Sequence, residues 1–341
     1  MKILILAGGG GTRLFPLSTQ NRPKQFLPLA DNEPLIISTI KRFLGICKPS
    51  DIVILTGEKF KEETLKVLSK HNLLAVHVVL EPCAKNTAPA IVLGASYCRD
   101  VLKIDKSEPM FVVPSDQVIR PLDIYLKSIE SALQGAKNKH IAVLGIKPTR
   151  PDTGYGYIEI DKNRKSSDKF SISKISAFKE KPDEATAKKF LKLGHYLWNA
   201  GMFAFSLEGL EQELAKHSSE LSDFLKLNYS DALKQFSNQA SISIDYALAE
   251  KSSNMYVAEC PVEWSDIGSF DAYYDFCSKD SNGNVLIGSV VAIECKNCLI
   301  ISDDTNLKIL GQTNKIIVSS AGNTIVLDRN NSQEVKRFIS T

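Results

Sequence analysis

An uncharged apolar run followed by consecutive glycines opens the chain and constrains its fold more than any other stretch. Residues 3–7 read ILILA, and Gly8, Gly9, Gly10 and Gly11 follow directly. Such a run is typical of a strand buried on both faces of a parallel sheet. Glycines at the end of a strand leave backbone N–H groups free to converge on an anion, because no Cβ blocks its approach. The stretch therefore predicts an α/β sheet with an anion site at a strand end.

Two cations follow the glycines. Arg13 supplies a planar fork of donors, and Lys24 supplies a mobile point charge. The familiar phosphate motifs do not fit, because no GK[ST] follows and Arg13 stands where the third glycine of a dinucleotide fingerprint belongs. A glycine-rich turn is often only a loop, but Pro23 and Gln25 at these spacings favour a polyphosphate site.

The composition excludes several classes of function. With 341 residues the chain exceeds one ordinary domain, which predicts a large and a small one. Its 42 basic and 39 acidic residues are too balanced for a nucleic-acid-binding surface. No apolar run reaches the roughly 18 residues that a membrane span requires, and the first strand begins too early for a signal peptide.

The cysteines predict a reducing compartment. Their count of seven is odd and they are scattered, so we expect reduced thiols and a cytoplasmic protein. Cys295 and Cys298 form a lone CxxC without the second pair or the histidines that a zinc site needs, and we expect both to be packed thiols.

Short apolar runs alternate with helical patterns through the first half of the chain. Strands are expected at residues 3–7, 51–56, 76–80, 110–113 and 140–146, and helices at 35–44, 59–70, 86–104 and 123–136. This order predicts a doubly wound, mostly parallel, Rossmann-like sheet, with ligands beyond the carboxyl ends of its strands. Further strands are expected at 154–160, 174–178, 197–205 and 255–259, and helices at 183–193, 208–236 and 244–251.

The pattern changes after the polar cluster SKDSNGN at residues 278–284. Short β-branched runs then recur about every 8–12 residues, which suggests a small β-solenoid or barrel-like module. Helical periodicity returns only in SQEVKRFI near the end. We therefore expect a large domain at 1–277 and a small β domain with a terminal helix at 278–341.

Residues 8–29, GGGGTRLFPLSTQNRPKQFLPL, resemble the motif GGxGTRLxPLSxxxxPKxxL of sugar-nucleotide pyrophosphorylases. The ending PKQFL is similar to the mannose-1-phosphate guanylyltransferases in particular. The resemblance implies a GT-A-like nucleotidyltransferase sheet, a C-terminal left-handed parallel β-helix and a homodimer. It assigns catalytic roles to Arg13 and Lys24.

A second block, EPCAKNTAPA from Glu81, resembles the family's EPxxRNTAPA on the nucleotide side. Taken alone, the stretch predicts only a strand end followed by a helix cap. A carboxylate can accept from the N1 and N2 donors of guanine, so we hypothesise that Glu81 contacts the base. The residues implied in nucleotide binding are Leu6, Ala7, Gly8, Gly9, Gly10, Gly11, Thr12, Glu81, Asn86, Thr87 and Ser115.

Two aspartates are candidate magnesium ligands. A carboxylate at a strand end suits Mg²⁺, although Asp116 alone could be a turn residue and Asp266 alone a helix cap. PSDQ at 114–117 resembles the family's PSDH, and WSDIGS at 264–269 resembles WSDVGS. The resemblance implies that both aspartates bind Mg²⁺. Gln117 replaces the family histidine, which puts any role of that histidine in doubt.

Three further stretches resemble the sugar-binding blocks GYGYI, EKP and WNSGMF. Carboxylate and amide groups can pair with sugar hydroxyls, and glycine allows close approach. The residues implied in sugar-phosphate binding are Gly156, Glu180, Lys181 and Asn199. SIDYALAEK at 243–251 resembles SIDYxxxEK, so Asp245 or Glu250 could support this site, although a plain helix explains the stretch equally well.

The expected reaction is transfer of the nucleotidyl group of GTP to mannose 1-phosphate, giving GDP-mannose and pyrophosphate with Mg²⁺. Two alternatives stay open. One is the same chemistry on another sugar 1-phosphate or nucleotide. The other is a non-catalytic regulatory homologue that binds GDP-mannose, although such a protein would be expected to have lost Arg13, Lys24 or a metal aspartate.

Overall fold

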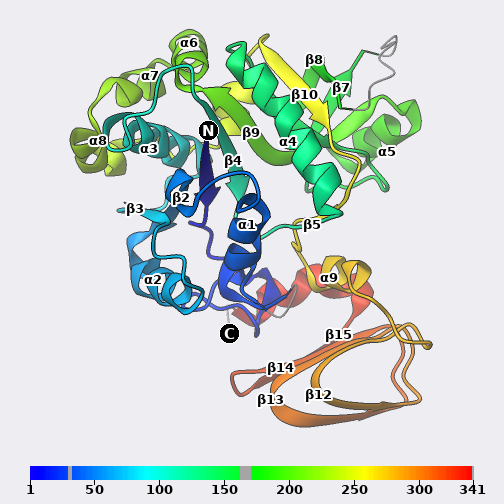
Figure 1. Ribbon diagram of the computed structural model, residues 1–341. Coiled ribbons are helices and arrows are strands. Elements are labelled where there is room, and N and C mark those ends of the chain that lie inside the picture. Colours follow the sequence, from blue (N-terminus) through cyan, green and yellow to red (C-terminus); the bar gives the residue numbers. More distant parts are fainter. Residues whose placement is uncertain (30–32, 162–169, 340–341) are drawn as a thin grey trace. The chain divides into compact units, whose positions relative to one another are not determined.

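The structure is a computed structural model that describes residues 1–29, 33–161 and 170–339 (Figure 1). The chain divides into two compact units, each assembled from separate stretches of sequence. The first unit contains Met1–Gly8, Ile40–Ser115 and Ile119–Glu263, and the second contains Gly9–Thr39, Asp116–Val118 and Trp264–Thr341. Residues 278–341 thus share a unit with the glycine-rich segment. A separate folding domain that begins at residue 278 stays a prediction.

The first unit is built on a nine-stranded sheet in the order β3-β2-β1-β4-β9-β6-β10-β8-β7. Its strands are β1 Lys2–Leu6, β2 Ile52–Gly57, β3 His77–Glu81, β4 Pro109–Pro114, β6 Ile141–Ile146, β7 Tyr157–Ile160, β8 Ile172–Lys179, β9 Tyr196–Ser206 and β10 Met255–Glu259. Each corresponds to a strand predicted from the sequence. Two short strands, β5 Val118–Arg120 and β11 Glu263–Ser265, lie where the chain passes from one unit to the other.

The direction of the strands follows the prediction only in part. Strands β3, β2, β1 and β4 are all parallel, as expected. Strand β9 then runs antiparallel to both β4 and β6, and β8 runs antiparallel to β10 and β7. Alternation of strands and helices predicts a parallel pair only where the helix carries the chain back across the sheet. The second half of the sheet is therefore mixed rather than mostly parallel.

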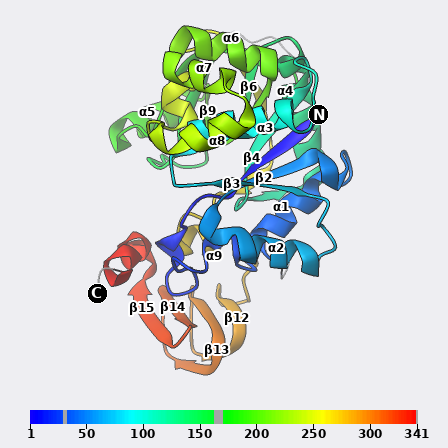
Figure 2. The ribbon, with the colours of Figure 1, turned by 90° about the vertical axis from the view of Figure 1, so that its left-hand side faces the viewer.

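Helices cover both faces of this sheet (Figure 2). Leu4, Val53 and Val112 point to the face on which α3 packs together with α6, α7 and α8. On the opposite face, the Phe43 ring packs tilted against Phe111 of β4 and edge-on against Tyr125 of α4, with ring centroids 6.0 and 6.3 Å away. Burial on both faces explains the uncharged strand sequences. The helices are α1 Leu35–Phe43, α2 Lys61–Lys70, α3 Thr87–Asp100, α4 Leu122–Lys137, α5 Glu184–Leu193, α6 Leu207–His217, α7 Ser219–Lys226, α8 Tyr229–Gln235 and α9 Phe270–Phe276.

One predicted helix has a different form. Residues 244–251 were expected to be α-helical, but Asp245–Ala249 form a π-helical turn, labelled η6. Its bond runs from the Glu250 N–H to the Asp245 carbonyl at 2.9 Å. Such turns are rare and are frequent at functional sites.

The second unit contains a four-stranded sheet in the order β12-β13-β14-β15. Its strands are β12 Val285–Ile293, β13 Leu299–Leu310, β14 Lys315–Ser320 and β15 Asn323–Asp328. The first three pair in parallel and the last pairs antiparallel. The predicted terminal helix is a 3₁₀ segment, η7 Arg329–Ile339, and two shorter 3₁₀ turns are η1 Thr12–Leu14 and η2 Lys24–Phe26.

The core of the second unit joins the two ends of the sequence. Leu14 and Leu27, which follow the glycines, pack with Phe270 of α9, Leu299 of β13 and Val335 of η7. The segment that carries the glycines and both predicted cations is therefore held by the C-terminal sheet and α9. Among the described helices, none is both long and apolar enough to span a membrane.

Candidate functional site

The predicted residues fall into two groups, one in each unit. Residues of the glycine segment from Gly9 to Arg13 lie in the second unit with Lys24, Asp116 and Asp266. The remaining predicted residues lie in the first unit. Three of the predicted motifs coincide with places where the chain passes between units, namely Gly8–Gly9, Ser115–Asp116 and Glu263–Trp264.

The end of β1 is fixed by the sheet. The Ala7 N–H donates to the Leu55 carbonyl at 2.7 Å, and the Thr56 hydroxyl donates to the Ala7 carbonyl at 3.0 Å. The Ser115 N–H donates to the Leu6 carbonyl at 3.0 Å. Since these backbone groups are already engaged, Leu6, Ala7 and Ser115 set the position of the loop that follows β1.

Glu81 lies against the first glycine. Its side chain is buried, and a Cβ added at Gly8 would lie 3.0 Å from its Oε1. Burial raises the pKa of Glu81 to about 7. The carboxyl group is therefore close to half ionised at neutral pH, and only a residue without a side chain leaves it this space at position 8.

Asn86 and Thr87 have clear structural roles. Asn86 Oδ1 accepts from the Thr87 N–H at 2.8 Å as the N-cap of α3, and the Asn86 backbone adopts φ +66°. Thr87 Oγ1 accepts from the Ile244 N–H at 2.8 Å. The helix-cap interpretation of this block is confirmed, and the same contacts anchor the segment that leads into the π-helical turn.

Gly156, Glu180 and Asn199 come together in the first unit although they lie far apart in the sequence. The Asn199 N–H donates to the Gly156 carbonyl at 2.8 Å. A Cβ at Gly156 would lie 2.5 Å from Glu180 Oε2 and 3.3 Å from Asn199 Cβ. The Asn199 side-chain amide donates to Asp245 Oδ1 at 2.8 Å, so the π-helical turn belongs to the same cluster.

The charges in this cluster are unusual. Glu180 is buried; its Oε1 pairs with the Lys181 ammonium, and its Oε2 has no hydrogen-bond partner within the described chain. The Glu180 N–H donates to Glu250 Oε1 at 3.0 Å. Burial, followed by the Glu180 charge, raises the pKa of Asp245 to about 6. A buried carboxylate oxygen without a partner is well suited to accept from a ligand hydroxyl.

Arg150 belongs to none of the motifs in the sequence. Its guanidinium lies 5.4 Å from the Trp198 ring and 6.0 Å from the Tyr155 ring, and these residues adjoin Asn199 and Gly156. Arg150 also pairs with Asp152 at 2.7 Å. Its place beyond the carboxyl end of β6 is the one signal that could have identified it.

In the second unit the glycine segment folds onto Lys24. Gly11 adopts φ +52°, and a Cβ there would lie 2.8 Å from both the Cβ and the N atom of Lys24. By contrast, a Cβ at Gly9 or Gly10 would meet no atom within 4 Å, and both residues are exposed. Arg13 is also exposed. The loop thus presents two accessible glycines beside a fixed turn.

Lys24 is anchored rather than mobile, in contrast to the expectation from the sequence. Its ammonium pairs with Asp116 Oδ2 at 2.7 Å, and its side chain is only 8% exposed. It also donates to the carbonyl of Asp266 and, at 3.5 Å, to that of Ile267. One buried cation therefore links the two predicted metal aspartates.

The Asp266 loop has a constrained backbone. Ile267 is fully buried and adopts φ +43°, which a β-branched residue rarely does. Its N–H donates to Ser265 Oγ at 3.0 Å, and the Gly268 N–H donates to Asp266 Oδ1 at 3.1 Å. These bonds hold the loop in the conformation that directs the Asp266 carbonyl to Lys24.

The oxygen atoms of Asp116 and Asp266 are of the kind that fits Mg²⁺. Within residues 1–29, 33–161 and 170–339, no three His, Cys, Asp or Glu side chains gather as a metal cage. Asp116 and Asp266 are the two carboxylates that the sequence predicts as ligands. Mg²⁺ is commonly bound by one or two carboxylates together with substrate phosphates and water. The Lys24 ammonium pairs with the Asp116 carboxylate and donates to the Asp266 carbonyl, so oxygen atoms of both aspartates already bind a cation.

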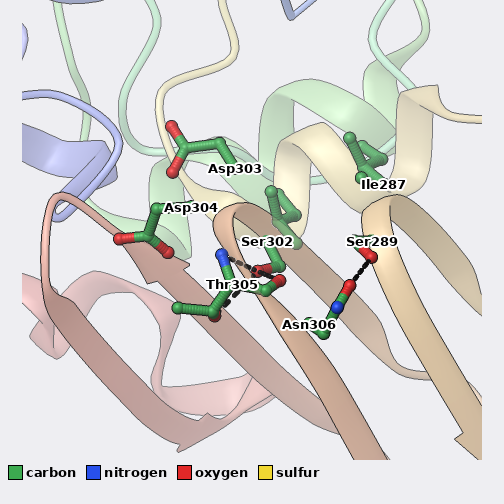
Figure 3. Close-up of a pocket in the computed structure, with 9 residues that line it drawn as sticks. Ile287, Ser289, Ser302, Asp303, Asp304, Thr305 and Asn306 are labelled. Atoms are coloured by element: carbon green, nitrogen blue, oxygen red, sulfur yellow. Dashed lines mark hydrogen bonds between the residues drawn. The ribbon is translucent and has the colours of Figure 1, made fainter.

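A separate hollow of about 450 Å³ lies over β12 and β13 (Figure 3). Its polar groups satisfy one another. Ser302 Oγ donates to the Thr305 carbonyl at 2.6 Å, Asp303 accepts from Ser320 Oγ at 2.9 Å, and Asp304 accepts from the Gly322 N–H at 2.8 Å. Because these serine and aspartate groups already bond within the protein, this hollow is a poorer candidate than the predicted site.

Comparison with known proteins agrees with these motifs. The nucleotidyl transferase family model matches residues 2–283. A mannose-1-phosphate guanylyltransferase of Escherichia coli is 34% identical over 98% of this chain and 74% of its own length. The alginate biosynthesis protein AlgA of Pseudomonas aeruginosa is 31% identical over 98% of this chain and 71% of its own length. The crystal structure of a protein described as mannose-1-phosphate geranyltransferase from Thermus thermophilus aligns with a TM-score of 0.88 at 26% identity, covering 99% of this chain and 98% of that one.

Proposed function

Because the chain belongs to the nucleotidyl transferase family and, within it, to the mannose-1-phosphate guanylyltransferases, we propose that it transfers the guanylyl group of GTP to mannose 1-phosphate. The products are GDP-mannose and pyrophosphate. One observation supports the proposal above the others. Arg13 and Lys24, predicted from one motif, and Asp116 and Asp266, predicted from two others, all lie in one compact unit, where Lys24 contacts both aspartate segments.

The chemistry needs no nucleophile from the protein. An oxygen of the sugar phosphate attacks the α-phosphorus of GTP, the new P–O bond forms, and the bond to the β-phosphate breaks with release of pyrophosphate. The protein then contributes positioning and charge neutralisation. Exposed Arg13, beside the open glycines, would neutralise the leaving β- and γ-phosphates, and Lys24 would neutralise charge at the α-phosphate.

Asp116 and Asp266 would hold Mg²⁺. When bound, the ion neutralises phosphate charge and orients the phosphate oxygens. The anchored Lys24 keeps the two segments together before the nucleotide arrives, since its ammonium already contacts Asp116 and the Asp266 carbonyl.

The first unit carries the residues that the family resemblance implies for the base and the sugar. Ionised Glu81 would accept from the N1 and N2 donors of guanine, near the loop that starts at Gly8. Glu180 Oε2, buried and without a partner in the described chain, would accept from a mannose hydroxyl, next to Asn199. Lys181 would contact the sugar phosphate.

Three finer expectations remain part of the proposal. Support for a β-solenoid in the C-terminal sheet comes from its register, because Val285 pairs with Leu299 and Leu299 with Ile316, while Lys296 pairs in parallel with Thr313. The family resemblance implies a left-handed β-helix and a homodimer. The seven free cysteine thiols favour a cytoplasmic location. Light scattering after size exclusion would measure the oligomeric state.

The experiment that tests the function is pyrophosphate release with a panel of nucleoside triphosphates and sugar 1-phosphates. We expect GTP with mannose 1-phosphate to be turned over fastest. Arg13→Ala or Asp266→Ala should lower turnover about 10²-fold or more while circular dichroism stays unchanged. Near-normal turnover in either folded variant would contradict the assignment. Binding of GDP-mannose without any turnover of the panel would instead favour the regulatory alternative.

A further inference from the structure

A side-chain hydrogen bond joins the two aspartate motifs. The indole N–H of Trp264 donates to Gln117 Oε1 at 3.0 Å. Gln117 directly follows Asp116, and Trp264 lies two residues before Asp266. All four residues belong to the second unit, although the two segments are far apart in the sequence.

In the sequence, the two bonded residues lie close to the aspartates that contact the Lys24 ammonium. Gln117 is buried, whereas the side chain of Asp116 is 33% exposed and reaches the Lys24 ammonium. Asp116 lies in a turn, and Gln117 directly precedes β5. The burial of Gln117 and the partial exposure of Asp116 show that the two side chains lie in different surroundings.

Two ligands on separate segments need such a link. Mg²⁺ demands near-ideal geometry, and ligands must be held within about 0.5 Å of their working positions by the groups around them. Lys24 fixes the Asp116 carboxylate and the Asp266 carbonyl but leaves the separation of the two backbones to other contacts. Strands β5 and β11 pair in a two-stranded sheet that holds the two backbones together, and the Gln117–Trp264 bond extends this link to the residue next to Asp116.

We propose that Gln117 and Trp264 are positioning residues that hold Asp116 and Asp266 at the spacing required for the divalent ion. The inference rests on the proposed metal-dependent transfer. It also explains why glutamine is acceptable where the family motif has histidine. The indole N–H needs only an acceptor, which a glutamine carbonyl and a neutral imidazole both supply.

The test measures binding of Mn²⁺, as a spectroscopic replacement for Mg²⁺, by electron paramagnetic resonance with GTP present. Gln117→Met removes the acceptor at nearly constant shape, and Trp264→Phe removes the donor. We expect each to weaken Mn²⁺ binding about tenfold or more, the usual effect of losing a group that supports a metal ligand. The KM for mannose 1-phosphate should not change. Gln117→His at pH 8 should restore Mn²⁺ binding.

A double variant and a matched control separate positioning from general loosening. The double variant Gln117→Met/Trp264→Phe should be no weaker than either single variant, because both remove the same bond. Tyr274→Phe loses a different hydrogen bond of the same unit, from its hydroxyl to the Gly283 carbonyl at 2.6 Å, and should bind Mn²⁺ normally. Normal Mn²⁺ binding by Gln117→Met, or equal weakening in Tyr274→Phe, would overturn the proposal.

Asp116→Asn and Asp266→Asn distinguish this inference from the proposed function. If both abolish Mn²⁺ binding while Gln117→Met and Trp264→Phe bind normally, the positioning role is refuted and the metal assignment stands. If neither aspartate variant changes Mn²⁺ binding, the metal assignment and the positioning role are both refuted.

Discussion

Replacing Gly156 by alanine gives the sharpest test of the sugar side of the site. The added Cβ would lie 2.5 Å from Glu180 Oε2, 3.2 Å from Phe178 Cζ and 3.3 Å from Asn199 Cβ. Carbon and oxygen atoms that are not bonded do not approach so closely, so something must move. The Gly156 carbonyl is held by the Asn199 N–H at 2.8 Å, whereas the Glu180 carboxylate is the end of a flexible side chain. We therefore expect the carboxylate to move.

The size of the effect follows from what Glu180 would lose. A hydrogen bond to a charged group contributes about 1.5–3 kcal/mol, and each step of about 1.4 kcal/mol is about tenfold in affinity. Gly156→Ala should therefore raise the KM for mannose 1-phosphate about 10- to 100-fold. The KM for GTP should stay near normal. Overpacking should also cost about 1–3 kcal/mol in the free energy of unfolding.

A second glycine separates substrate binding from stability. A Cβ at Gly135 in α4 would lie 3.2 Å from Ile172 Cδ1 and 3.3 Å from Ala142 Cβ, with no predicted site residue among these contacts. Gly135→Ala crowds this interior but also gains about 1 kcal/mol of helix propensity, and it should leave the KM for mannose 1-phosphate unchanged. A normal KM for mannose 1-phosphate in Gly156→Ala would refute the predicted displacement of the Glu180 carboxylate. An equal rise in the KM values for both substrates would refute its specific role toward the sugar.

Three further predictions concern Glu81, Asn86 and Lys24. The pKa of Glu81 is raised from 4.5 to about 7, so its contribution to stability is present below pH 4.5 and is lost as the pH rises through 7. Glu81→Gln should therefore gain up to about 3 kcal/mol over the parent between about pH 4.5 and pH 8 in urea titrations, and equal pH profiles would refute this. Asn86→Ala should destabilise more than Asn86→Gly, because both lose the cap but only alanine is strained at φ +66°; the reverse order of unfolding midpoints would contradict it. Lys24→Met should lower turnover at least about 100-fold and weaken Mn²⁺ binding, since it removes the cation that joins the aspartate segments; stronger Mn²⁺ binding would show that Lys24 competes with the metal instead.

The parallel half of the sheet was predictable because local patterns define it. The apolar runs within residues 3–7, 51–56 and 110–113 became β1, β2 and β4. An apolar strand can stay uncharged only when both faces are covered, and this requirement is visible in the sequence. The cap at Asn86 was likewise visible, because it involves neighbouring residues.

The antiparallel insertion of β9 was not predictable in this way. Its sequence is as apolar as that of a parallel strand, and its direction is set by pairing with β4 and β6 across long stretches of chain. The π-helical turn at Asp245–Ala249 was also not predictable from local patterns. The segment that leads into it is held by a distant residue, since the Ile244 N–H donates to the Thr87 hydroxyl.

The candidate site shows the same division. The sequence identified Lys24, Asp116 and Asp266 as separate polar residues near strand ends or turns. It did not reveal that the Lys24 ammonium is buried on one aspartate and on the carbonyl of the other. It also left Arg150 unnoticed, because a single basic residue in a loop has no local signal of function.

The sequence alone therefore determined the types of element, the glycine segment that can approach an anion, and the residue chemistry of each motif. These properties depend on neighbours within a few positions and on hydrophobic periodicity. Only the tertiary structure decided which motifs share a unit, which strands run against the others, and which charges are already paired. Those properties depend on contacts between distant segments, for which apolar and polar side chains have many possible partners until the chain has folded.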